Sequence, residues 1–196
     1  LLDGGTGLVY STNTSKDHNF TPNKEDYYFV SFDQKTNLFR QLSCKVPANP
    51  VTGLTSALRA YTETRDPEDF FWCMDYQGTL FKFFPDEERT ELTGVNWDDK
   101  GVYTTSIAMS PRCRYLYYVL SAQGQGQKWG TPVIQYDTKT GRKKAVAFLA
   151  AFYHETYGYL PGGTFGVELS EDGSLLVVHM NGYFGPWKQG GAYGQC

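Results

Sequence analysis

Residues 166–178 read GVELSEDGSLLVV, and residues 106–119 read SIAMSPRCRYLYYV. Each stretch has a short apolar segment, a tight turn that opens with a serine, and a strongly apolar run. Sixty residues separate the two serines, Ser110 and Ser170. The apolar residues alternate or run continuously, whereas an amphipathic helix would space them every 3.6 residues. The pattern therefore predicts a strand–turn–strand unit that occurs twice.

A second motif alternates with the first along the chain. It consists of an aromatic residue, an aspartate and a short polar turn, and it occurs at residues 30–38 (VSFDQKTNL), 83–89 (FFPDEER) and 134–141 (IQYDTKTG). In the first and third copies, Asp33 and Asp137 can accept hydrogen bonds from the amides of their own turns. Asn37 and Gly141 then stand where a positive φ costs least. The middle copy departs from this pattern, so the sequence specifies its turn less well than those of the other two copies.

Together the two motifs divide the chain into four repeats of strands. The first repeat has strands at 8–12, 27–32 and 38–44 and lacks its first strand; the second has 56–61, 69–75, 79–84 and 89–92; the third has 104–109, 115–120, 133–136 and 142–148; the fourth has 164–169 and 175–180. No segment predicts a capped helix, so the chain is expected to be all-β. Four-stranded repeats of about 40–50 residues are typical of propeller blades.

The sequences at 170–178 (SEDGSLLVV) and 136–141 (YDTKTG) resemble the repeats of WD40-like and YVTN-type β-propellers. The resemblance implies a β-propeller fold, and it identifies no catalytic residue in this chain. It is not a full WD40 repeat, because the Trp97–Asp98 pair follows a predicted strand instead of closing one. Sandwiches and single-sheet arrays also contain strand–turn–strand repeats. The propeller is favoured because two motifs recur in the same order at one period.

The expected fold is therefore an all-β propeller of about three and a half four-stranded blades. We place the blades at residues 1–48 (partial), 51–94, 101–149 and 164–196 (partial). Propellers close with about four to eight blades. We therefore expect this chain to be part of a seven- or eight-bladed ring, whose remainder comes from the same parent chain or from another chain.

Composition excludes several classes of protein. Apolar residues make up 40% of the 196 residues and aromatic residues 16%, which suits a packed core and not a disordered chain. The net charge of −3 offers no basic surface for nucleic acid. The longest stretch free of both charge and strong polarity, residues 145–153, is about half a membrane-spanning helix, so no membrane segment is expected.

The cysteines and the missing motifs say little about chemistry. The four cysteines lack metal-ligand spacing, and we expect Cys44 and Cys73 to be buried free thiols. No phosphate-binding loop, dinucleotide fingerprint or nucleophile elbow is present, so no cofactor and no metal are expected. The sequence does not specify the cellular compartment of the protein, and an extracellular or periplasmic location is favoured.

The long connections all fall on one face of the predicted propeller. They occupy residues 11–26, 46–54, 95–102, 121–132, 150–163 and 181–192, while the turns on the other face are short. Long loops on a rigid scaffold are where binding and catalysis concentrate. The residues we expect to bind a ligand are Trp97, Asp98, Trp129, His154, Tyr157, Tyr159, Tyr183 and Trp187.

Two functions fit these residues. Tyr and Trp present a flat apolar face with a polar edge, which suits sugar rings. The leading interpretation is a binding propeller that presents an aromatic, glycine-rich loop face to a carbohydrate or a protein. The alternative is a secreted or periplasmic lyase or hydrolase acting on a glycan, with His154 and Tyr157 as acid–base catalysts. Asp98 and Asp99 with Glu155 could instead hold a hard cation.

Overall fold

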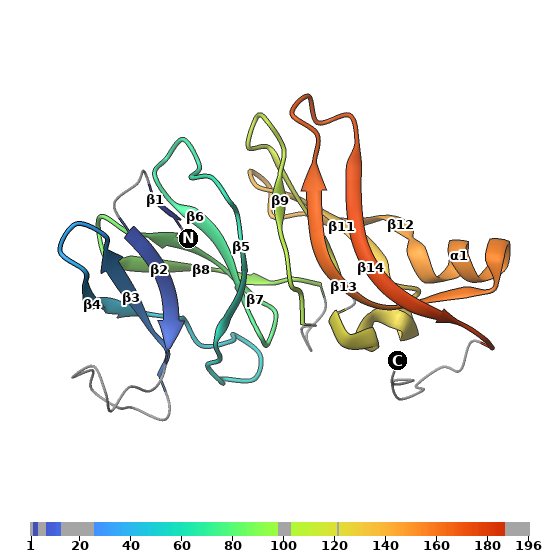
Figure 1. The fold of residues 1–196 in the computed structure, drawn as a ribbon, viewed down its shortest axis with the longest axis horizontal. Coiled ribbons are helices and arrows are strands. Elements are labelled where there is room, and N and C mark those ends of the chain that lie inside the picture. The colour runs from blue at the N-terminus through green and yellow to red at the C-terminus, as the bar shows by residue number, and fades with distance from the viewer. Residues whose placement is uncertain (1, 4–6, 13–25, 98–102, 121, 187–196) are drawn as a thin grey trace. The chain divides into compact units, whose positions relative to one another are not determined.

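The computed structural model describes residues 2–3, 7–12, 26–97, 103–120 and 122–186. The chain forms two compact units, residues 1–100 and residues 101–196, and each is taken by itself below (Figure 1). Every pair of neighbouring strands in the described residues is antiparallel. The strands of the described residues form three four-stranded sheets and one two-stranded sheet, so the protein has the expected all-β, propeller-like fold.

The first unit contains two four-stranded sheets in simple sequence order. One has β1 (Leu2–Asp3), β2 (Gly7–Thr12), β3 (Tyr28–Asp33) and β4 (Leu38–Lys45); the other has β5 (Leu58–Tyr61), β6 (Phe71–Asp75), β7 (Thr79–Phe84) and β8 (Arg89–Val95). The prediction that the first repeat lacks its first strand was wrong, because β1 pairs with β2 through Leu2 and Asp3. A two-residue strand is too short to show any periodicity in the sequence.

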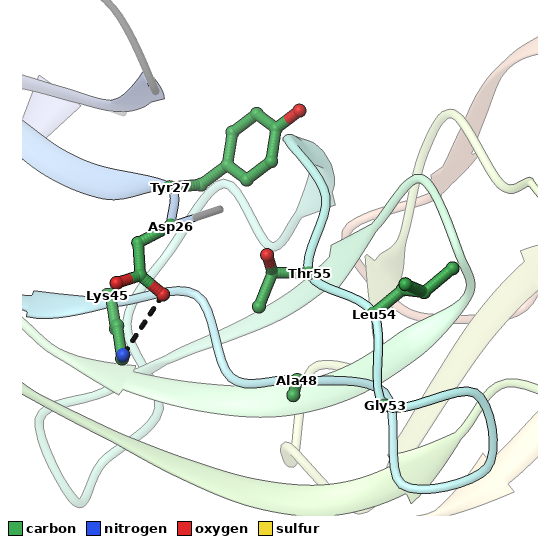
Figure 2. A pocket seen from close by; sticks show the side chains of 7 residues that line it. All are labelled: Asp26, Tyr27, Lys45, Ala48, Gly53, Leu54 and Thr55. Carbon is green, nitrogen blue, oxygen red and sulfur yellow. Dashed lines mark hydrogen bonds and ion pairs between the residues drawn. The ribbon is translucent and has the colours of Figure 1, made fainter. Parts of the chain in front are cut away.

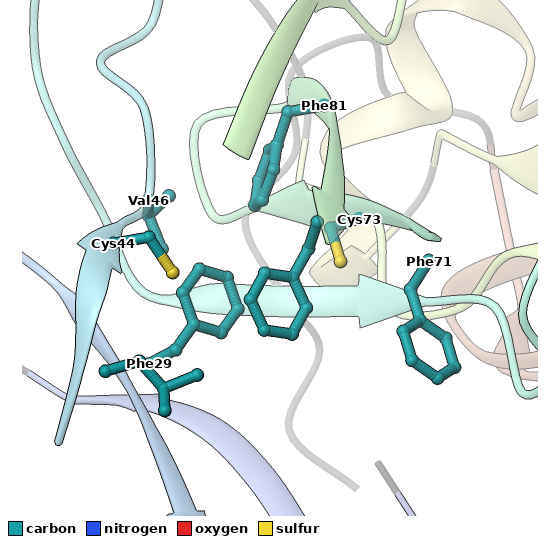
Figure 3. Packing of buried hydrophobic residues seen from close by; sticks show 8 residues of the cluster. Phe29, Cys44, Val46, Phe71, Cys73 and Phe81 are labelled. Carbon is teal, nitrogen blue, oxygen red and sulfur yellow. The ribbon is translucent and has the colours of Figure 1, made fainter. Parts of the chain in front are cut away.

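An aromatic core joins the two sheets of this unit. The cluster contains Phe29, Leu42, Cys44, Val46, Phe71, Cys73, Phe81 and Phe83 (Figure 3). Phe29 and Phe83 stack face to face with ring centroids 4.0 Å apart, and both side chains are fully buried. Cys44 and Cys73 are buried free thiols, which confirms that prediction. Burial raises the pKa of Cys44 to about 12, so this thiol stays protonated and unreactive.

A buried polar network fixes the connection between β4 and β5. The Asp75 carboxylate, at the end of β6, accepts hydrogen bonds from the Ser56 hydroxyl at 2.7 Å and from the Thr79 amide at 2.7 Å. The Asn49 side-chain amide donates to the Thr79 hydroxyl at 3.1 Å. Burial raises the pKa of Asp75, and its side chain is completely shielded from water. The network ties the β4–β5 connection to the β6–β7 turn.

The second unit has one four-stranded sheet and one hairpin. The sheet contains β9 (Ala108–Met109), β10 (Tyr115–Val119), β11 (Pro132–Asp137) and β12 (Lys143–Phe148); the hairpin contains β13 (Tyr159–Leu169) and β14 (Leu176–Phe184). Their shared core contains Ala108, Val119, Val133 and Val167, with Leu169, Leu176 and Val178 packed against it. One face of the hairpin therefore packs on the sheet.

The repeated motifs form matching turns. The Ser110 hydroxyl accepts a hydrogen bond from the Tyr115 amide at 2.9 Å, and Ser170 accepts one from Leu175 at the same distance. The other motif also recurs: Asp33 accepts the Lys35 amide at 2.8 Å, and Asp137 accepts the Lys139 amide at 3.0 Å. In its middle copy the aspartate, Asp86, instead pairs with Arg65 at 2.8 Å.

Two helical segments were not predicted. They are η1 (Ala122–Trp129), a 3-10 helix, and α1 (Leu149–Tyr157), and both lie where the sequence suggested loops. Phe148 at the start of α1 offers no side-chain cap; instead the Leu149 and Ala150 amides donate to the Thr131 and Gly130 carbonyls at 3.0 and 2.9 Å. These bonds depend on the tertiary fold, so no local signal marks the helix. Neither helix in the described residues is long and apolar enough to cross a membrane.

Candidate functional site

Five aromatic side chains gather in the second unit, where α1 meets the open end of the β13–β14 hairpin. We call this cluster the aromatic patch: Phe152, Tyr153, Tyr157, Tyr159 and Phe184. Ring centroids lie 5.3 Å apart for Phe152 and Tyr153, 6.2 Å for Tyr153 and Tyr159, and 5.4 Å for Tyr159 and Phe184. The rings therefore form a continuous chain of contacts from the helix to the last residue of β14.

Local structure explains why these rings meet. Tyr153 and Tyr157 are four residues apart on α1, so they lie on one face of the helix. Gly158 then adopts a left-handed φ of 67°, and its amide donates to the His154 carbonyl at 2.9 Å. Glycine is suited to this conformation, and the chain passes directly into β13. Tyr159 is paired with Phe184 across the hairpin, so both side chains are on the same face.

The patch combines exposed and half-buried rings. Phe152, Tyr157 and Phe184 keep 56%, 60% and 77% of their surface in water, while Tyr153 and Tyr159 are half-buried. Exposed aromatic residues that lie together mark an interaction site more often than scattered ones do. Each ring offers a flat apolar face, and each tyrosine adds a hydroxyl that can donate or accept a hydrogen bond.

Close packing at Gly182 supports the edge of the patch. A side-chain carbon at this position would lie 2.1 Å from the Leu160 carbonyl oxygen and 2.6 Å from Cζ of the Tyr159 ring. We expect Gly182→Ala to lower the free energy of unfolding by about 1–3 kcal/mol, because backbone must move to admit the methyl group. Chemical denaturation of the purified chain measures this loss. Gly185→Ala is the matched control, since its nearest neighbour would be 3.6 Å away; an equal loss in both variants would contradict the packing.

The structure brings only some of the predicted ligand-binding residues together. Tyr157 and Tyr159 belong to the aromatic patch. Tyr183 lies next to Phe184 on β14 and so points to the opposite face of the strand. Trp129 ends η1 half-buried, with the Lys128 ammonium 3.7 Å from its ring centroid. Trp97 is in the other unit, half-buried after β8. Asp98 and Trp187 lie outside the described residues, as does Asp99.

The predicted catalytic pair lies on α1 and not in a loop, which corrects the sequence prediction. His154 is half-buried and stands three residues before Tyr157, so the two occupy neighbouring positions on the helix. Glu155 is exposed on the same helix. Within the described part of the chain, no group of three His, Cys, Asp or Glu residues is placed to hold a metal ion.

Phe152 and Phe184 were missed as members of the site. Phe152 looked like part of an apolar run before the tyrosine-rich stretch. Phe184 lies four residues beyond the predicted end of its strand, and two irregularities in the β13–β14 register bring it opposite Tyr159. No sequence signal specifies such irregularities, so the pairing could not be read in advance.

A pocket in the first unit lies between two chain segments that the sequence assigned to the long-loop face. Its volume is about 570 Å³, and its lining contains Asp26, Tyr27, Lys45, Ala48, Gly53, Leu54 and Thr55 (Figure 2). The Lys45 ammonium pairs with the Asp26 carboxylate at 3.0 Å. None of the lining residues was predicted as part of a site. We call this cavity the β4–β5 pocket.

Comparison with known proteins gives a fold neighbour and no family. No protein-family model and no curated protein matches the sequence. Among solved structures, the chain is similar to a Bacteroides uniformis ATCC 8492 protein assigned as a 6-phosphogluconolactonase, with a TM-score of 0.50 and 14% identity. The match covers 90% of this chain and 47% of that one, so this chain spans about half the length of its neighbour. At this identity the likeness shows the fold alone: the chain is an all-β, propeller-like protein.

Proposed function

We propose that this protein binds a carbohydrate and that the aromatic patch is the surface that takes the glycan. The observation that carries the proposal is the chain of five touching rings, of which Phe152, Tyr157 and Phe184 are largely exposed. A ligand that covers this surface must present flat apolar faces together with polar edges. Sugar rings have both, because their C–H groups form the faces and their hydroxyls the edges.

Physical chemistry favours stacking as the source of affinity at this surface. An aromatic ring that packs against a flat partner gains contact area at little cost in conformational entropy, because it has only two side-chain torsions. The patch lies on a helix and a hairpin, so its rings need little ordering when a ligand binds. We therefore expect the exposed ring of Tyr157 to matter more than its hydroxyl.

A titration with defined oligosaccharides tests this proposal. The probes are hexasaccharides of glucose, xylose, mannose and N-acetylglucosamine, measured with the full chain by calorimetry. We expect at least one of them to bind, and Tyr157→Ala to weaken that binding about tenfold, which is about 1.4 kcal/mol. Tyr157→Phe should bind within about twofold of the native protein, because it keeps the ring.

Controls separate this function from a general loss of structure. Tyr61→Ala removes a tyrosine that is 38% exposed in the other unit, and it should leave glycan binding unchanged. Failure of all four hexasaccharides to bind would overturn the proposal, as would equal binding by Tyr157→Ala and the native protein.

A glycan lyase or hydrolase is the second candidate, favoured by the placement of His154 and Tyr157 three residues apart on α1. In that case both groups would transfer protons, and a proton-transferring tyrosine cannot be replaced by phenylalanine. The four hexasaccharides, incubated with the protein and analysed by mass spectrometry, would then be shortened. Cleavage that is lost in both His154→Ala and Tyr157→Phe would favour the enzyme, whereas binding without cleavage favours the binding protein.

A further inference from the structure

We propose that the β4–β5 pocket is a second binding site, which takes a small neutral polyol the size of a single sugar ring. The site belongs to the first unit, and it neither includes nor depends on the aromatic patch. A volume of about 570 Å³ falls within the range of small-ligand sites, which is about 300–1,000 Å³.

The polar side of the pocket is an ion pair. The Lys45 ammonium and the Asp26 carboxylate are 3.0 Å apart, and Lys45 keeps 52% of its side-chain surface in water. The hydrogen bond that Lys45 donates to the Asp26 carboxylate raises the pKa of Lys45, so the ammonium stays charged at neutral pH. An ammonium has three N–H donors, and an ionised carboxylate has about four acceptor positions. The pair can therefore donate to one hydroxyl and accept from its neighbour, which is what two adjacent hydroxyls of a polyol require.

The charge balance of the pocket selects against ions. Among the described residues that line it, one is positive and one is negative, so their formal charges cancel. An anion that approached Lys45 would be repelled by Asp26, and a cation that approached Asp26 would be repelled by Lys45. A neutral ligand with several hydroxyls meets neither penalty.

The remaining walls suit the body of such a ligand. The Tyr27 ring, Thr55 and Ala48 follow one another from top to bottom of the view into the pocket (Figure 2). Tyr27 provides an aromatic ring, and Thr55 provides a hydroxyl. The pocket thus combines apolar and hydrogen-bonding walls, as small-molecule sites do.

The β4–β5 connection is held in place before any ligand arrives. Asn49 is 1% exposed, and its side-chain oxygen accepts hydrogen bonds from the Val51 and Thr52 amides at 2.9 and 3.1 Å. Its backbone pairs with Leu54 and Gly53, at 2.8 and 2.9 Å. One buried residue therefore organises the turn that forms the pocket wall. A wall fixed in this way reduces the ordering cost of binding.

Binding of single polyols to the full chain tests the proposal. The probes are glucose, mannose, galactose and myo-inositol, with inorganic phosphate as the ionic comparison, and amide chemical shifts are followed by NMR. We expect at least one polyol to bind with a dissociation constant on the order of 1 mM. Its binding should move the amide signals of Ala48, Gly53 and Thr55. This readout uses the native protein and does not depend on any variant folding.

Variants then test the ion pair. Lys45→Met and Asp26→Asn should each weaken polyol binding about tenfold or more. Glu91→Gln is the matched control, because it breaks a surface ion pair with Lys82 (3.1 Å) away from the pocket. Glu91→Gln and Tyr157→Ala should bind the polyol like the native protein, and the second variant separates this site from the aromatic patch. The proposal is overturned if no polyol binds in the millimolar range, if the shifts are confined to residues outside the pocket, if phosphate binds instead, or if Lys45→Met and Asp26→Asn bind normally.

Discussion

Replacing Phe83 with alanine is expected to lower the free energy of unfolding of the first unit by about 3–5 kcal/mol. Phe83 is fully buried and stacks face to face on Phe29, with an angle of 1° between the ring planes. Its removal loses the transfer free energy of the ring and leaves a cavity between two sheets. Urea denaturation followed by circular dichroism measures the loss.

An exposed phenylalanine of the same unit provides the control. Phe39 on β4 keeps 43% of its surface in water, so Phe39→Ala should cost less than half as much as Phe83→Ala. Equal losses in the two variants would show that the Phe29–Phe83 stack does not hold the two sheets together.

Replacing Asp75 with alanine is expected to lower the free energy of unfolding by about 2–5 kcal/mol. The Thr79 amide and the Ser56 hydroxyl both donate to this carboxylate, and each buried donor left without an acceptor costs about 1–3 kcal/mol. Asp75→Asn is the matched control, because its side-chain oxygen still accepts from the Thr79 amide. Its loss should be clearly smaller in the same denaturation experiment; equal losses would contradict the network.

Asp75 also predicts a pH dependence. Burial raises its pKa above the ordinary value of 3.8, so the native state binds this proton more tightly than the unfolded state. The protonated Asp75 therefore contributes stability to the folded state. This contribution is full below pH 3.8 and is lost as the pH rises through the raised pKa. Over that interval Asp75→Asn should gain stability relative to the native protein. Parallel curves of unfolding free energy against pH for the two proteins would contradict the raised pKa.

The turns and most strands could be predicted from the sequence because their causes are local. Ser110 and Ser170 accept hydrogen bonds within their own turns, and Asp33 and Asp137 do the same. The alternation of apolar residues then identifies the strands between the turns. The number of blades in a closed ring stays a prediction.

The helix and the two sites could not be predicted in full because their causes are tertiary. Carbonyl groups about twenty residues upstream accept the first hydrogen bonds of α1. Tyr157 and Tyr159 were found through the density of tyrosines around them, but Phe184 joins them only through the hairpin register. Asp26 and Lys45 are nineteen residues apart and meet because Tyr28 pairs with Lys45 across β3 and β4.

NMR of the tyrosine rings shows directly whether the aromatic patch binds a glycan. Protein labelled with ¹³C in the rings of its 15 tyrosines is titrated with each of the four hexasaccharides. If the patch binds the glycan, a hexasaccharide moves the ring signals of Tyr153, Tyr157 and Tyr159 while those of Tyr61 and Tyr76 stay in place. Shifts confined to tyrosines outside the patch, or no shift with any of the four sugars, would contradict glycan binding at the patch.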